Sequence, residues 1–143
     1  MKLFDHWQVW ALLSAGFAAL TAIFAKIGIE NINSDFATVI RTIVILLIAA
    51  AIVVATGQWQ DPATVSGRTW VFLALSGAAT GLSWLSYFRA LKLGQAAQVA
   101  PIDKLSVVIV AIVAAVFLGE RLSPAAWTGV GMIAAGAIMV ALN

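Results

Sequence analysis

The chain has 143 residues, of which 63% are hydrophobic and 10% charged, and its formal net charge is +2. This composition lies outside the range of soluble domains and is typical of a protein embedded in a bilayer. The charges are scattered, so nucleic acid is not expected as a partner. Without cysteine and with His6 as its one histidine, the chain has too few ligands for a metal site. We therefore expect neither a metal nor a cofactor.

Five apolar windows are long enough to cross the hydrocarbon core, which takes about 20 helical residues. They cover approximately residues 7–25, 36–56, 69–88, 99–118 and 124–142. The prediction is an all-α integral membrane protein with five transmembrane helices, forming a single membrane domain over residues 1–143.

The first two spans each have a basic residue at a notable place. Lys26 follows the first span and has the i,i+4 spacing of a surface ion pair with Glu30. It is as well explained by an anchor at the membrane surface as by a ligand contact. Arg41 lies about 8 Å inside the second span, which is entered through the helix-capping residues Asn33-Ser34-Asp35. Arg41 either snorkels to the nearby surface or serves a polar vestibule, and the long apolar run after it slightly favours the vestibule.

The third span is closed by Arg89 and Lys92, and its second half contributes Trp84 and Tyr87 as candidate aromatic lining of a substrate path. Small residues at helical spacing indicate close helix packing, either within one chain or between two chains. They are Gly77 and Gly81 in the third span and Gly129 and Gly136 in the fifth. Serine and threonine hydroxyls in the spans are a weak signal, because such groups often bond their own backbone.

The fourth span begins within VAPIDKLSVV and allows two interpretations. In the first, Pro101 is the first helical residue, Asp103 lies in the favourable first turn, and Lys104 snorkels to the surface. In the second, the helix begins before Pro101 and carries Asp103 and Lys104 to a depth where each needs a water-filled cavity. Adjacent residues do not face each other on a helix, so we do not expect these two to form a pair.

A short polar turn separates the last two spans. Gly119 is expected to stop the fourth helix, and Glu120 and Arg121 turn the chain back. Ser123 is then the expected N-cap and Pro124 the first residue of the fifth helix. The last two helices should form a tight antiparallel hairpin.

The segment from Tyr87 to Gly136 resembles the second half of an EamA repeat of the drug/metabolite transporter superfamily. The resemblance lies in YFRALKLG, the proline-led fourth helix, the Gly-Glu-Arg turn and the glycine-bearing fifth helix, and the first two spans are similar in layout. It implies one five-helix repeat of a small-molecule transporter, multi-pass in a bacterial cytoplasmic (inner) membrane, and not an enzyme. Family members commonly carry two such repeats in inverted orientation, with the substrate cavity between them.

The Lys and Arg residues are nearly balanced between the two membrane faces. The face where the first span starts, called face A, receives three of them, and the opposite face B receives five, including Arg41 and Lys104. Orientation is therefore weakly specified. Two copies inserted in opposite senses would recreate the inverted pair of repeats. We expect a small-molecule secondary transporter or exporter working as an antiparallel homodimer with alternating access; the alternative is an accessory or assembly subunit that packs against a larger membrane partner.

Overall fold

The computed structural model describes residues 6–142, which form helices joined by loops, with no strand in that range. The chain divides into two compact units. The α2–α3 unit comprises Ala25–Lys92, and the α4–α6 unit comprises the chain up to Phe24 and from Leu93 onward. Five helical segments are long and apolar enough to cross a membrane, which confirms the predicted fold class. They are Trp7–Gly28, Ser34–Ala55, Gly67–Leu93, Ala96–Phe117 and Pro124–Ala141.

Helix α1 (Trp7–Gly28) exposes large apolar side chains along most of its length. Phe17 and Phe24 are about two-thirds exposed, at 66% and 65%, whereas the small Ala22 and Ala25 are buried. A soluble domain would hide such aromatic rings from water, but a bilayer solvates them. The surface of α1 thus fits a lipid environment.

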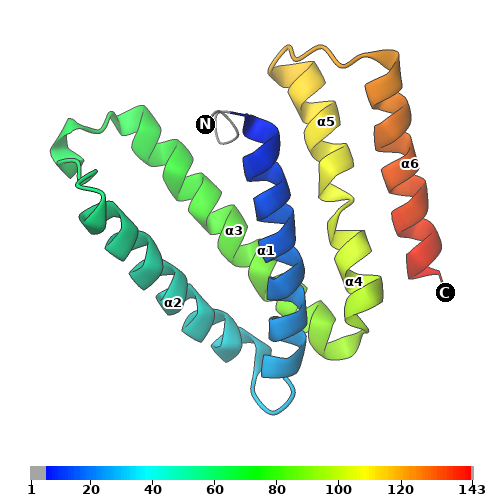
Figure 1. The fold of residues 1–143 in the computed structure, drawn as a ribbon, viewed down its shortest axis with the longest axis horizontal. Helices are drawn as coiled ribbons and strands as arrows, with labels where there is room; N and C mark the ends of the chain where they lie inside the picture. Colours follow the sequence, from blue (N-terminus) through cyan, green and yellow to red (C-terminus); the bar gives the residue numbers. More distant parts are fainter. Residues whose placement is uncertain (1–5, 143) are drawn as a thin grey trace. The chain divides into compact units, whose positions relative to one another are not determined.

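Helices α2 (Ser34–Ala55) and α3 (Gly67–Leu93) form an antiparallel pair joined by a loop that contains the 3₁₀ turn η2 (Pro62–Thr64) (Figure 1). Of the three predicted capping residues, Asn33 is the N-cap of α2, and its side chain accepts hydrogen bonds from the amides of Asp35 and Phe36. Gly57, with a φ of 65°, ends the helix. The Gln58 amide then donates to the Val53 carbonyl at 3.0 Å, which closes a Schellman turn.

The fourth span is not one regular helix. Helix α4 (Ala96–Asp103) begins five residues before Pro101, so the interpretation that made Pro101 the first helical residue is wrong. Inside the helix, proline cannot donate the bond to the carbonyl four residues earlier. The chain then tightens into i→i−3 bonds, such as Leu105 N to Ile102 O at 2.9 Å, before α5 (Ser106–Phe117) begins. The interruption between α4 and α5 is visible in Figure 1.

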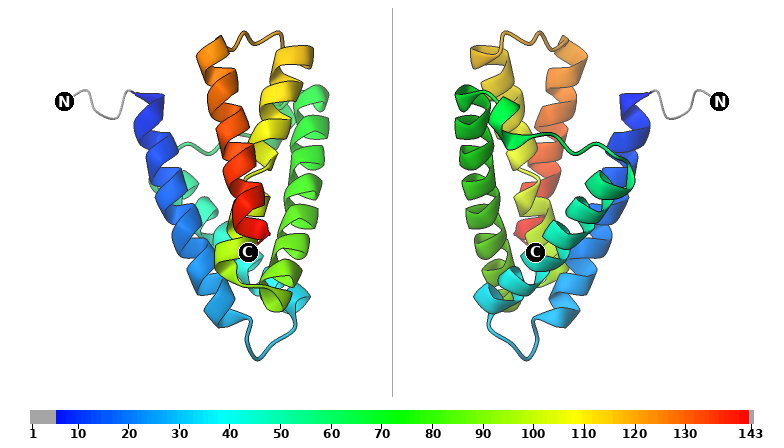
Figure 2. Two further views of the ribbon diagram at one scale, coloured as in Figure 1. Left: turned by 90° about the vertical axis from the view of Figure 1, so that its right-hand side faces the viewer. Right: turned by 90° about the vertical axis from the view of Figure 1, so that its left-hand side faces the viewer.

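Helices α5 and α6 (Pro124–Ala141) form the predicted hairpin and lie side by side (Figure 2). Gly119 has a φ of 69°, in the left-handed region, and it follows the last residues of α5. Ser123 is the N-cap of α6, accepting from the Ala126 amide at 3.2 Å, and Pro124 is the first helical residue, as predicted. The turn that joins α5 to α6 is six residues long, from Leu118 to Ser123.

Candidate functional site

The six candidate residues for a substrate path fall into two groups. The α2–α3 unit holds Lys26, Arg41, Trp84 and Tyr87, and the α4–α6 unit holds Asp103 and Lys104. Within the first group the structure brings Arg41 of α2 together with Trp84 and Tyr87 of α3.

Arg41 stacks on the indole ring of Trp84. The guanidinium carbon Cζ lies 3.2 Å from the centroid of the Trp84 ring and 5.9 Å from that of Phe88. An arginine held over aromatic faces gains cation–π attraction, which is larger where water is partly excluded. The Arg41 side chain is half-buried and turned toward α3, so the structure adds a third choice to snorkelling and an open vestibule: an arginine anchored on aromatic rings.

Three aromatic rings of α3 form a cluster beside this arginine. The Trp84 ring meets Tyr87 edge-on at 5.5 Å between centroids, and it meets Phe88 at 5.8 Å. Phe88 is buried, with 3% of its surface exposed, whereas Trp84 and Tyr87 are half-buried. The cluster fixes the Trp84 ring from one side and leaves it in contact with Arg41 on the other.

Three polar links lie at the face-B ends of α1, α2 and α3, and sequence reasoning missed them. Arg89 donates to Asp35 in a two-pronged arrangement, from Nε to Oδ1 at 3.0 Å and from Nη2 to Oδ2 at 2.6 Å. The Lys92 ammonium donates to the carbonyl of Ile32. The Lys26 ammonium donates to the carbonyl of Leu91 at 2.6 Å. Lys26 therefore reaches from the end of α1 to the end of α3.

The signal for the Asp35–Arg89 pair was present but indirect. Asp35 starts the second span at face B and Arg89 ends the third span at the same face, so antiparallel packing of these neighbours places opposite charges side by side. A planar guanidinium matches a carboxylate with two parallel hydrogen bonds. The pair joins the face-B ends of α2 and α3, and both side chains are substantially exposed, at 61% for Arg89 and 43% for Asp35.

Asp103 and Lys104 do form a pair, so the expectation that they would not is wrong. The Lys104 ammonium lies 3.2 Å from the Asp103 carboxylate oxygen Oδ2. The reason is the interruption of the fourth span: Asp103 is the last residue of α4, Lys104 is its C-cap, and the four-carbon lysine stem folds back. The half-buried Asp103 therefore has its charge balanced by its own neighbour.

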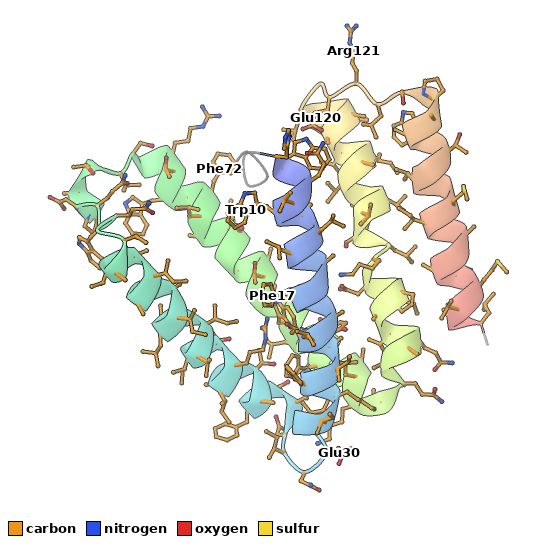
Figure 3. The ribbon with its side chains drawn as sticks, in the orientation of Figure 1. Trp10, Phe17, Glu30, Phe72, Glu120 and Arg121 are labelled. Atoms are coloured by element: carbon orange, nitrogen blue, oxygen red, sulfur yellow. The ribbon has the colours of Figure 1, made fainter. Side chains whose placement is uncertain are left out.

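The serine and threonine hydroxyls of the spans add little free polar surface, and the glycines singled out in the sequence have open surroundings. Thr21, Thr80 and Ser86 each donate to the carbonyl four residues earlier. Gly129 and Gly136 in α6, like Gly77 and Gly81 in α3, have no heavy atom within 4 Å of where a Cβ would stand. The polar turn residues Glu120 and Arg121 lie between α5 and α6, with Arg121 projecting away from both helices (Figure 3).

One open groove in the α2–α3 unit is apolar. It is lined by Thr38, Val39, Thr42, Ile43, Gly81 and Leu85. The hydroxyls of Thr38 and Thr42 donate to backbone carbonyls, at 3.0 and 2.7 Å, so their methyl groups remain to line it. None of the six candidate residues lines this groove, which therefore lacks the chemistry of the Arg41 site.

Comparison with known proteins agrees with the resemblance found in the sequence. The pattern of the EamA-like transporter family matches residues 6–142. A protein of Sinorhizobium sp, described as "Uncharacterized transporter in cobO 3'region", is 68% identical over 138 residues, which cover 96% of this chain and 98% of that relative. No solved structure matches the chain. With five membrane-spanning helices and a family match over nearly its whole length, the chain is a multi-pass membrane protein that belongs to the EamA-like transporter family.

Proposed function

We propose that this protein is a secondary transporter of a small molecule, that two copies assemble in antiparallel orientation, and that the site alternates in its access to the two sides of the membrane. Membership of a transporter family argues for transport and against an enzyme. The substrate path runs past Arg41 and the aromatic cluster of Trp84 and Tyr87. In the α4–α6 unit, Asp103 and Lys104 at the interrupted fourth span are separate candidates for substrate contact.

The observation that carries the proposal is the position of Arg41. It lies seven residues into α2, about 10 Å along the helix from Ser34, within a segment otherwise suited to lipid. A charged side chain at such depth is costly, and in membrane proteins such residues usually mark a pathway for a substrate or ion. Stacking on Trp84 holds the guanidinium in place without neutralising its charge.

The dimer is supported by the extent of the family match and by the charge balance. One EamA match accounts for five helices, whereas the family arrangement described above uses two such repeats in inverted orientation. A relative of almost the same extent is itself named a transporter. Because the Lys and Arg residues are nearly balanced between the two faces, insertion in both senses is physically accessible.

Two measurements test the proposal, one of transport and one of orientation. Proteoliposomes loaded with a bacterial metabolite extract should lose at least one solute faster than protein-free liposomes, as measured by mass spectrometry, and the Arg41→Leu protein should lose this activity. If no solute leaves faster than from protein-free liposomes, the transporter proposal fails and the accessory-subunit alternative becomes the better account.

Orientation is tested with single cysteines, since the native chain has none. Gln58 lies in the loop between α2 and α3 and Asn31 in the turn before α2, and both are exposed at opposite membrane faces. In intact cells, an impermeant thiol reagent should label about half of each variant, because half of the copies present that face outward. Labelling of only one of the two positions would rule out the antiparallel dimer while leaving transport itself open to the liposome test.

A further inference from the structure

We infer that Arg41 and the aromatic cluster of Trp84, Tyr87 and Phe88 form a binding site for a small organic anion, a carboxylate or phosphate with a planar apolar body. This inference rests on the proposed transport function and names the class of substrate.

The guanidinium of Arg41 has its face covered and its edge available. Trp84 covers one face at 3.2 Å, and among residues 6–142 no hydrogen-bond acceptor or carboxylate is paired with its five N–H donors. Stacking on a ring uses the face of a guanidinium, whereas recognition of a carboxylate or phosphate uses its edge. The two interactions are therefore compatible at the same time.

The acidic residues of the same unit do not supply the missing anion. Asp35 is held by Arg89 through two hydrogen bonds. Asp61 accepts from the Ala63 amide in the loop before η2, and Glu30 is exposed in the turn after α1 (Figure 3). With five Lys and Arg residues against three acidic ones, the unit also has a positive excess that favours an anionic ligand.

The rings beside Arg41 determine what the rest of the ligand should be. Trp84 and Tyr87 are half-buried and present aromatic surface next to the guanidinium. Ligand sites commonly combine such apolar walls with one or two polar groups that fix orientation. An anion with a planar apolar body satisfies both parts, whereas a bare inorganic anion satisfies only the arginine.

The molecule contains a matched reference pair. The Cζ atom of Arg68 lies 5.8 Å from the Phe72 ring centroid near the start of α3, and Arg68 is exposed. Like the Arg41 site, this pair places a guanidinium near an aromatic ring, but it has no second or third ring and is not partly buried. Arg68→Gln therefore removes the same charge from the same unit while leaving the Arg41 site intact.

The test measures ligand binding to purified full-length protein in phosphatidylcholine nanodiscs, without any transport step. Benzoate and phenylphosphonate should bind, and neutral benzamide and cationic benzylamine should bind at least about tenfold more weakly, because a charge-assisted hydrogen bond is lost. Arg41→Gln should weaken benzoate binding at least about tenfold, Arg41→Lys less, and Arg68→Gln should bind as the wild type does. The benzoate-induced change in tryptophan emission should vanish in Trp84→Phe.

Several results would overturn the inference. They are equal binding of benzoate and benzamide to the wild type, unchanged benzoate binding in Arg41→Gln, and no binding by any anion in the panel, as would occur if a carboxylate of the protein already occupied Arg41. The comparison of benzoate with benzamide needs only the wild type, so it decides the matter even if a variant fails to fold. Displacement of benzoate by added phosphatidylglycerol would assign the site to a lipid headgroup and would also overturn a substrate role.

Failure of this inference and failure of the proposed function give different results. Solute efflux from liposomes without anion binding would leave the transporter standing and remove the anion site. Anion binding that depends on Arg41, without any efflux, would leave the site standing and remove transport.

Discussion

Replacing Gly119 by alanine should destabilise the protein by about 1 kcal/mol, and the reason is purely conformational. Gly119 has a φ of 69°, and no heavy atom lies within 4 Å of the position a Cβ would take. The left-handed conformation costs a residue with a side chain about 1–2 kcal/mol. Alanine also restricts the unfolded chain, which returns about 0.4–1 kcal/mol. The net loss lowers the ratio of folded to unfolded protein about fivefold.

The free energy of unfolding can be measured by titration with SDS in mixed micelles, with helical content as the signal. Gly57→Ala should behave like Gly119→Ala, since Gly57 has a φ of 65° and equally open surroundings. Gly129→Ala, inside α6 with open space around it, should instead stabilise by about 0.5–1 kcal/mol. Asparagine at 119 should recover part of the loss. If Gly119→Ala were as stable as the wild type, the argument from backbone conformation would be refuted.

Four further substitutions test the polar residues. Arg41→Leu should increase the membrane-inserted fraction, because an arginine inside a span is costly, up to about 2.5–3.5 kcal/mol at the centre and less at the depth of Arg41. It should also abolish efflux; an active protein would remove Arg41 from the path. Asp103→Asn should lower efflux with unchanged folded yield, and normal flux would reduce Asp103 to a structural role. Asp35→Asn and Arg89→Gln should each lower resistance to SDS, and the double variant should be no worse than either single one; additive losses would argue against a direct pair.

The five spans were predictable because each is a long apolar window. The helix caps at Asn33 and Ser123 were predictable because such side chains accept hydrogen bonds from amides only a few residues later in the chain. The start of α4 was not predictable in the same way. Its N-cap, Gln95, makes no capping hydrogen bond through its side chain, so no strong sequence signal marks it, and Pro101 offered a misleading one. The pairing of Asp103 with Lys104 depends on that same interruption and was missed with it.

The candidate site was only half predictable. Arg41 and Trp84 could each be singled out, because a charge and a tryptophan are unusual so deep in a span, but their contact depends on the packing of α2 against α3. One clue was available: Arg41 lies seven residues from the face-B end of α2, and Trp84 lies nine residues from the face-B end of α3. At about 1.5 Å per residue these are similar depths. Nothing in a single sequence says which spans are neighbours, so the clue could not be used.

Two polar links at face B place a pivot at that end of α2 and α3. Asp35 pairs with Arg89, and the Lys92 ammonium donates to the carbonyl of Ile32 just before α2. For a helix about 33 Å long, a rotation of about 10° around that end would displace its far end by roughly 6 Å. Arg41, about 10 Å from the pivot, would move by less than about 2 Å. The helix pair can therefore open widely at face A while the arginine and its tryptophan stay together.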